Sequence, residues 1–230
     1  MATIIDNLQA VQARIARAAA GAGRRPEEVS LVAVSKTFPD RLIAEAHAAG
    51  QRAFGENYVQ EAVEKITKLA PLAPPPVWHF IGPVQSNKTA IIATHFQWVH
   101  GIEREKIAQR LNAARPEGLP PLQVCIQVNV SGENSKSGVA PGEEAVLAEA
   151  IAGLPRLRLR GLMAIPEPTP DADLQRRRFA RLREIKERLA ARGHALDTLS
   201  MGMSDDLEAA IAEGATMVRV GTAIFGKRDR

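Results

Sequence analysis

The sequence is poor in cysteine and in aromatic residues. Cys125 is the only cysteine, so no disulfide can form within the chain and no Cys-x-x-Cys metal pair exists. None of the five histidines stands in a His-x-His or His-x-x-x-His pair, which leaves a metal site without support. Aromatic residues make up only 4% of the chain. The core is therefore expected to consist mainly of small aliphatic side chains, as in a parallel sheet covered by helices.

The sequence also lacks long hydrophobic runs. No apolar run reaches the length of a membrane span, and the chain does not open with a basic segment followed by an apolar one. We therefore expect a cytoplasmic protein without a membrane partner. A net charge of +4 over 230 residues is mild. The arginine triplet at 176–178 lies on an amphipathic helix whose charges are expected to face solvent, so we expect no nucleic-acid partner.

The dominant pattern is an alternation of strand-like and helical segments. The strand-like segments are 29–35, 52–56, 77–82, 97–102, 122–130, 158–165, 198–203 and 217–224. Strands that alternate with helices predict parallel βαβ units, and eight strands close a (β/α)8 TIM barrel. A doubly wound open sheet is the alternative. No linker divides the chain, so we expect a single domain over residues 1–230.

The two ends of the chain carry an irregularity in this alternation. After the eighth strand only residues 226–230 remain, which are too few for a closing helix. The N-terminus instead carries a surplus helix over residues 3–20, with Ile4, Leu8, Val11 and Ile15 at helical spacing. We predict that this extra helix packs beside the last strand and covers the gap.

Lys36 is the first residue that points to chemistry. The reactive groups of a (β/α)8 barrel lie at the carboxyl ends of its strands. Lys36 ends the first strand, where side-chain alternation places it on the same face as Val32 and Val34. If that face points into the barrel, desolvation lowers the pKa of the amine, and a neutral amine can form a Schiff base with an aldehyde. If it points outward, Lys36 merely begins a loop.

The ends of the seventh and eighth strands suggest a phosphate site. Gly221 allows close approach of the backbone, and Thr222 adds an N–H and a hydroxyl. Ser204 can cap the helix that follows it and also face an anion. Arg219, on the same face as Gly221, can neutralise a phosphate or donate to a ring nitrogen. A lysine and a phosphate cradle at one barrel mouth together suit a phosphorylated aldehyde, of which pyridoxal 5′-phosphate (PLP) is the obvious one.

Eight segments spread over nearly the whole chain carry a specific resemblance. They are LVAVSK (31–36), FGENYVQE (54–61), WHFIG (78–82), QSNK (85–88), VNVSGENSKSG (128–138), GLM (161–163), SMGMSDD (200–206) and VRVGTAIFG (218–226). With these segments the chain resembles the PLP homeostasis protein family. The resemblance implies a fold similar to the N-terminal domain of alanine racemase, the fold-type III barrel. It also implies that PLP is the cofactor and is held as a Schiff base on Lys36.

The resemblance further implies the residues that surround the cofactor. The phosphate is assigned to Ser204, Gly221 and Thr222, with Arg219 either there or at the pyridine nitrogen. The other candidates for the pocket are Asn57, His79, Met163 and Ser200. For the first three, a role in packing or in loop hydrogen bonding is the alternative. Lys136 could contact a second ligand or accept PLP transiently, although a surface lysine is the favoured interpretation.

The function that the resemblance implies is intracellular PLP (vitamin B6) homeostasis, in which the protein holds PLP and supplies it to apo-enzymes without robust catalysis. A PLP-dependent amino-acid racemase of the alanine racemase type is the alternative. It lacks support because the chain ends directly after the eighth strand and its only tyrosine, Tyr58, begins a helix, so a second base is missing. A Schiff-base aldolase without PLP is a third hypothesis. We expect a monomer or a weak dimer.

Overall fold

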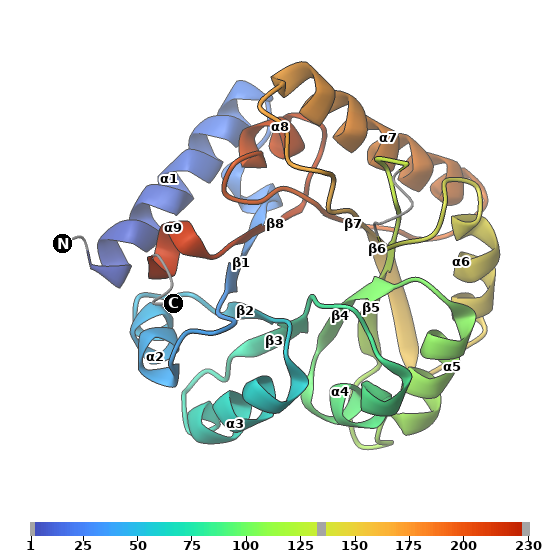
Figure 1. Cartoon of the computed structure of the whole chain (residues 1–230), viewed down its shortest axis with the longest axis horizontal. Coiled ribbons are helices and arrows are strands. Elements are labelled where there is room, and N and C mark those ends of the chain that lie inside the picture. The colour runs from blue at the N-terminus through green and yellow to red at the C-terminus, as the bar shows by residue number, and fades with distance from the viewer. Residues whose placement is uncertain (1–2, 133–136, 227–230) are drawn as a thin grey trace.

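The computed structural model describes residues 3–132 and 137–226 of the chain. Eight parallel strands close into a ring in the order β1 to β8, as Figure 1 shows. The strands are β1 (Ser30–Val34), β2 (Ala53–Glu56), β3 (Val77–Phe80), β4 (Trp98–Ile102), β5 (Leu122–Gln127), β6 (Leu157–Met163), β7 (Thr198–Ser200) and β8 (Met217–Val220). The predicted (β/α)8 barrel is confirmed, and the open doubly wound sheet is wrong.

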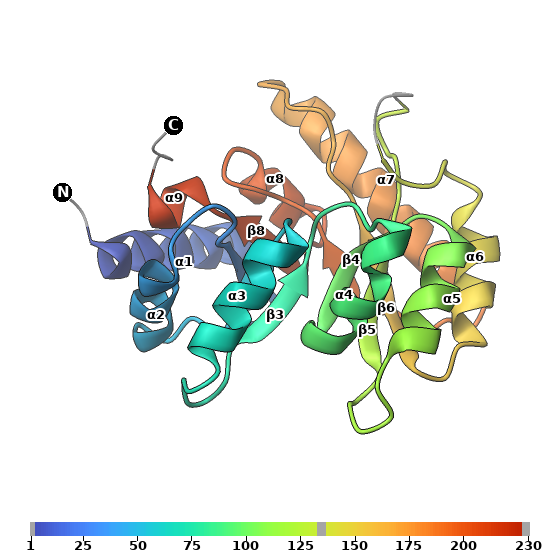
Figure 2. The same cartoon turned by 60° about the horizontal axis from the view of Figure 1, so that its bottom comes forward.

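Helices surround the ring of strands, and Figure 2 shows them from the side. They are α1 (Ile4–Gly21), α2 (Asp40–Ala48), α3 (Val59–Leu69), α4 (Thr89–His95), α5 (Glu105–Ala114), α6 (Glu144–Ala152), α7 (Ala172–Ala191), α8 (Leu207–Ala212) and α9 (Thr222–Phe225), with the 3₁₀ turns η1 (Pro26–Glu28) and η2 (Ser86–Lys88). Among the residues that the structure describes, no helix is both long and apolar enough to cross a membrane.

Side-chain alternation along the strands separates an outer from an inner layer. Outward-facing residues such as Phe54 and Val124 are fully buried in the core between strands and helices. On the inner side, a Cβ on Gly55 would lie 3.0 Å from both Val32 Cγ1 and Ile81 Cδ1, so β1, β2 and β3 converge closely there. The interior of the barrel is therefore a packed space rather than a pore.

The N-terminal helix α1 occupies the position predicted for it. Leu8, Val11 and Ile15 are buried, and α1 packs against α8 and α9 beside β8, as Figure 1 shows. Asn7 Nδ2 donates a hydrogen bond to the carbonyl of Ile224 over 2.9 Å. Arg24 Nη1 donates to the carbonyl of Ala215 over 2.8 Å. The prediction that this helix covers the gap beside the last strand is confirmed.

The eighth strand is shorter than predicted. It ends at Val220, and residues 222–225 form the one-turn helix α9 instead of extending the strand to 224. The amides of Ile224 and Phe225 both donate to the carbonyl of Gly221, over 2.9 and 3.0 Å. Both side chains are buried, and Phe225 packs on Phe38 with ring centroids 5.1 Å apart. Two adjacent side chains can enter one core from a helical turn but not from a strand, so the prediction that no helix follows the last strand is wrong.

Several other strands end earlier than predicted, and always at the same end of the barrel. The strand predicted over 122–130 ends at Gln127, and the one predicted over 198–203 ends at Ser200. Their remaining residues belong to loops at the carboxyl ends of the strands. These loops build the mouth of the barrel, where the candidate site lies.

Candidate functional site

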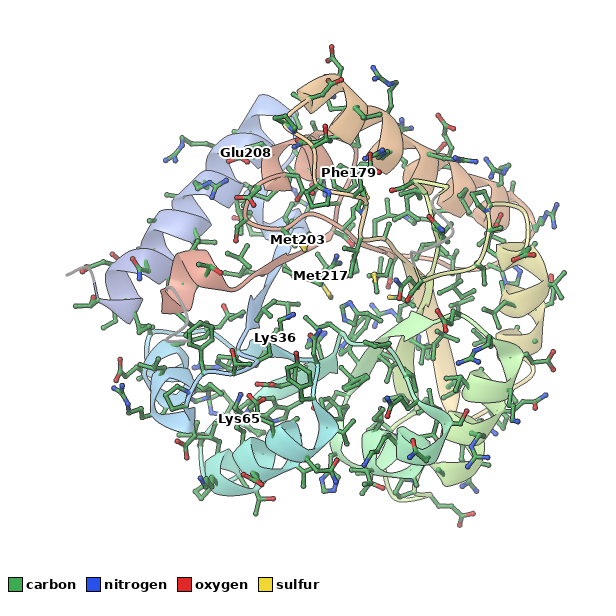
Figure 3. All side chains as sticks on the ribbon, in the orientation of Figure 1. Lys36, Lys65, Phe179, Met203, Glu208 and Met217 are labelled. Atoms are coloured by element: carbon green, nitrogen blue, oxygen red, sulfur yellow. The ribbon has the colours of Figure 1, made fainter. Side chains whose placement is uncertain are left out.

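Lys36 lies in a turn directly after β1 and is half-buried. The carboxyl end of β8 lies beside this turn: a Cβ on Gly221 would stand only 3.1 Å from the carbonyl oxygen of Val34. Glycine at 221 therefore permits the close approach of the two strand ends. Figure 3 shows Lys36 at the inner edge of the ring of strands, with Met217 nearer its middle. The lysine turn and the Gly221 turn are neighbours at the barrel mouth.

The rim around Gly221 offers backbone donors. Thr222 is exposed and begins α9. Within the part of the chain that the structure describes, the amides of Thr222 and Ala223 donate to no protein acceptor, as is usual for the first turn of a helix. Two N–H groups at this rim can therefore receive an anion.

Ser204 lies in the loop between β7 and α8, on the same rim, but it does not cap α8. That helix begins at Leu207, and no side chain caps it among the described residues. The carboxylate of Asp206 instead accepts a hydrogen bond from the amide of Met203 over 2.6 Å. The predicted capping role of Ser204 is wrong, because Asp206 closes this loop and the helix begins later than the sequence pattern suggests.

Arg219 begins a hydrogen-bonded chain through the barrel interior. Its Nη1 donates to Ser200 Oγ over 2.6 Å, and its Nη2 donates to the carbonyl of Ala164 over 2.9 Å. Ser200 Oγ lies 2.8 Å from His100 Nδ1. His100 Nε2 in turn lies 2.9 Å from His79 Nδ1. The four side chains come from β8, β7, β4 and β3 and are all buried, so the chain joins opposite walls of the barrel.

The direction of this chain follows from its members. A guanidinium can only donate, so Ser200 Oγ accepts from Arg219. The Ser200 hydroxyl then donates its own proton to His100 Nδ1. His100 therefore carries its proton on Nε2 and donates a hydrogen bond from there to His79 Nδ1. Burial lowers the pKa of His79 to about 3. Burial, followed by the neighbouring His79 and Arg219, lowers the pKa of His100 well below its usual value. Both imidazoles are therefore neutral at neutral pH.

Arg219 remains the charged end of the chain. Burial lowers its pKa to about 10, while the nearby Asp206 acts in the opposite direction. This pKa still lies far above neutrality, so the guanidinium is a permanent donor. Arg219 lies on β8, two residues before the Gly221 turn at the rim. Its guanidinium therefore lies deeper in the barrel than the rim.

Asn57 and Met163 complete the set of predicted residues. Asn57 directly follows β2, and its Oδ1 atom is buried without a hydrogen-bond partner among the described residues. Met163 ends β6, is buried, and pairs in register with Ser200 on β7. The predicted residues therefore share one end of the barrel. Among the described residues, Arg219 and Ser200 are the predicted pair that a hydrogen bond joins. Lys136 lies outside the described residues.

His100 is a member of the interior chain that the sequence reasoning missed. Metal-ligand spacing, which the histidines lack, gives no indication of it. His79 and His100 stand 21 residues apart, on the neighbouring strands β3 and β4. That separation equals one strand–helix repeat, and this signal could have indicated that the two rings meet inside the barrel.

The chain is similar to a known protein family, to curated proteins and to a solved structure. The family model described as "Alanine racemase, N-terminal domain" matches residues 7–229. The pyridoxal phosphate homeostasis protein of Pseudomonas aeruginosa is 64% identical over 229 residues, which are 100% of this chain and 97% of that protein. The protein of the same name from Escherichia coli K12 is 56% identical over 230 residues, 100% of this chain and 98% of that protein. The structure of PipY from Synechococcus elongatus with PLP bound has a TM-score of 0.80 and 38% identity, and the match covers 92% of this chain and 100% of PipY.

Proposed function

Since this chain belongs to the pyridoxal phosphate homeostasis protein family, we propose that it holds PLP as a Schiff base on Lys36, in one domain over residues 1–230. The observation that carries the proposal is the contact between the strand ends that bear Lys36 and Gly221. It brings an amine and backbone N–H donors to one mouth. PLP supplies an aldehyde that condenses with an amine and a phosphate that anchors it.

Three features of the mouth suit such a ligand. Lys36 offers an amine at the inner edge of the ring (Figure 3). The amides of Thr222 and Ala223 have no protein acceptor among the described residues and can donate to phosphate oxygens. The buried Oδ1 of Asn57 has no donor among them and can accept a hydrogen bond from a ligand. The residues present therefore fit PLP.

We assign the site residues by their depth in the barrel. Ser204, Gly221 and Thr222 lie at the rim and would hold the phosphate. Arg219 lies deeper and would donate to the pyridine ring, with Ser200 fixing its guanidinium and Met163 lining the floor. A charged arginine beside a ring nitrogen keeps that nitrogen unprotonated, which weakens the ring as an electron sink. This arrangement favours holding PLP over using it in catalysis.

We further propose that the protein is a carrier that supplies PLP to apo-enzymes, without robust catalysis of its own. The relatives are named for homeostasis rather than for a reaction. Tyr58 is 55% exposed and directly precedes α3, which makes it unsuited as a second proton-transfer base inside the barrel. The cytoplasmic location and the monomeric or weakly dimeric state stay predictions.

The cofactor assignment is tested by titrating the purified protein with PLP. We expect a visible absorbance band, because Nζ of Lys36 adds to the aldehyde carbon, a C=N bond forms and the aldehyde oxygen leaves as water. The band should be absent in Lys36→Ala and present in Lys68→Ala, which changes an exposed lysine of α3. A wild-type protein that shows no band, or a band that survives in Lys36→Ala, would overturn the proposal.

Two further assays separate the carrier from the racemase. Mixing the PLP-loaded protein with an apo PLP enzyme should restore the activity of that enzyme, and incubation with L-alanine should produce no D-alanine beyond a buffer control. Sustained turnover of L-alanine would instead support the racemase and refute the carrier.

A further inference from the structure

A buried cluster of charges lies on the outer side of β1 and β2, directly behind Lys36. Lys65 on α3 donates to Glu56 Oε1 over 2.8 Å and to Glu61 Oε1 over 2.5 Å. Glu56 ends β2 and is completely buried, and the side chain of Lys65 is only 7% exposed. Buried ion pairs cost desolvation energy and contribute little net stability. A role other than stability would explain why these charges lie here.

The cluster holds both peptide groups that flank Lys36. Lys65 Nζ donates to the carbonyl of Ser35 over 2.8 Å. Glu61 Oε1 accepts from the amide of Thr37 over 2.6 Å. The φ and ψ angles of Lys36 are the rotations between these two peptide planes. When both planes are fixed, the direction in which the Lys36 side chain leaves the backbone is fixed as well.

The cluster also sets which way Lys36 points. Ser35 Oγ donates to Glu56 Oε1 over 2.7 Å, so the Ser35 side chain faces outward toward α3. The side-chain alternation of β1, continued to Lys36 at the start of the turn, favours an inward direction for its side chain. Figure 3 agrees: Lys65 lies farther out, at α3, while Lys36 lies at the inner edge of the ring.

The backbone after Lys36 is strained. Thr37 has a φ of 67° and is the one non-glycine residue with positive φ in the described ranges 3–132 and 137–226. The left-handed region costs an L-residue about 1–2 kcal/mol, and a β-branched residue is an outlier there. Such a conformation persists only where its surroundings impose it. The contact from Glu61 to the Thr37 amide belongs to those surroundings.

We propose that Glu56, Glu61 and Lys65 form a backbone clamp that aims the amine of Lys36 into the barrel. All three are positioning residues: Lys65 and Glu61 hold the peptide groups of Ser35 and Thr37, and Glu56 holds Lys65 and the Ser35 hydroxyl. The inference rests on the proposed function, because it is as the attachment point of PLP that the aim of Lys36 matters.

Glu61 offers the mildest way to open the clamp. Its side chain is 31% exposed, so Glu61→Ala should fold while it removes the acceptor of the Thr37 amide. Glu61→Gln keeps an oxygen acceptor at the same place and serves as the conservative rescue. Glu64→Ala is the matched control, since it truncates an exposed glutamate of the same helix. Lys65→Met is a second, more severe variant.

Two measurements compare these variants with the wild-type protein. In the PLP-free protein, brief acylation followed by mass spectrometry gives the labelling rate of Lys36 relative to that of Lys68 in the same molecule. In PLP titrations, absorbance gives the affinity. We expect Glu61→Ala to change the relative labelling rate several-fold and to weaken PLP binding about tenfold, equivalent to about 1.4 kcal/mol. Glu61→Gln and Glu64→Ala should stay close to wild type in both.

The outcomes separate the clamp from a structural role and from failure of the proposed function. Wild-type labelling in both Glu61→Ala and a folded Lys65→Met would overturn the clamp, even if their melting temperatures fell. A wild-type protein that binds no PLP would overturn the proposed function, whereas the labelling experiment, which needs no PLP, would still support or refute the clamp.

Discussion

Two buried polar networks among the described residues lie on opposite sides of the wall of strands. The interior chain runs from Arg219 through Ser200 and His100 to His79 and holds one charge. The clamp lies between β1, β2 and α3 and consists of three ionisable side chains. The interior chain fixes a side chain, the guanidinium of Arg219, whereas the clamp fixes the backbone on either side of Lys36.

This difference predicts how each network fails. The interior chain depends on two histidines that must remain neutral, so acid should break it. The clamp depends on one ammonium shared by two carboxylates, so loss of that ammonium should break it at any pH at which the carboxylates are charged. Removing one partner of a buried ion pair leaves an uncompensated charge, which costs far more than the pair contributes.

The largest effect is expected at Lys65. Lys65→Met leaves Glu56 completely buried without its cation, and we expect a loss of about 3–5 kcal/mol in the free energy of unfolding at neutral pH. Urea denaturation followed by circular dichroism measures it. Lys68→Met, an exposed lysine on the same helix with a surface ion pair, should change stability by less than about 1 kcal/mol.

The double variant Lys65→Met/Glu56→Gln sharpens this test. It removes the buried carboxylate together with its partner, so it should recover part of the stability that Lys65→Met loses. If the double variant were as unstable as the single one or less stable, the uncompensated charge would not be the cause of the loss.

The second effect is an acid-induced loss of stability that originates in the interior chain. His79 and His100 have lowered pKa values in the folded protein, while a histidine in the unfolded chain titrates near pH 6.5. Below that pH the unfolded state binds protons that the folded state does not. Stability should therefore fall on acidification, by about 1.4 kcal/mol per pH unit for each histidine. For His79 this fall continues toward a pH of about 3.

The clamp should respond to pH with the opposite sign. Burial raises the pKa of Glu56, although the charge of Lys65 opposes the shift. Protonated Glu56 therefore stabilises the folded protein at low pH. This contribution to the free energy of unfolding is lost as the pH rises through the folded-state pKa of Glu56. In urea midpoints measured as the pH falls from 7, His79→Asn should flatten the acid loss. Glu56→Gln should steepen it over the pH range in which the folded protein protonates Glu56.

A smaller effect is expected from Ser200→Ala. This change removes the acceptor of Arg219 Nη1 and the partner of His100 Nδ1 together. Leaving buried polar groups unpaired costs about 1–3 kcal/mol, which urea denaturation at neutral pH can resolve. Ser86→Ala, at the surface-side turn before α4, provides the comparison. Equal losses of stability in the two variants would mean that the hydrogen bonds of Ser200 do not contribute to the stability of the barrel.

The sequence allowed the barrel to be predicted because each strand–helix repeat carries its own signal. The same local reasoning could not place the end of β8. Whether residues 222–225 extend the strand or turn into α9 depends on the carbonyl of Gly221 and on the contact between Phe225 and Phe38, which is far away in sequence. Tertiary contacts of this kind override local strand propensity.

The same limit applies to the site. The position of Lys36 and Gly221 at the barrel mouth could be predicted because strand ends define that mouth, while their role in binding stays a prediction. The clamp could not be predicted, since the sequence does not show which charges Lys65 meets. Lys65 shares the helix face of the buried Val59, Ala62 and Leu69, whereas Lys68 is exposed. The partner Glu56 becomes evident only when α3 packs on β2.

The smallest effect is expected in the reactivity of the Cys125 thiol, which should respond to changes in the interior chain but not to changes in the clamp. It is completely buried, and burial raises the pKa of its thiol to about 12, although Arg219 and Arg160 act to lower it. Because the thiolate is the nucleophile, we expect no reaction with a chromogenic disulfide reagent in the native protein and full reaction in urea. Ser200→Ala should speed the native reaction, since it loosens the interior that covers the thiol, whereas Glu61→Ala should not, since the clamp lies outside the strands. Equal acceleration in the two variants would mean that the networks form one cooperative unit and that the comparison between them fails.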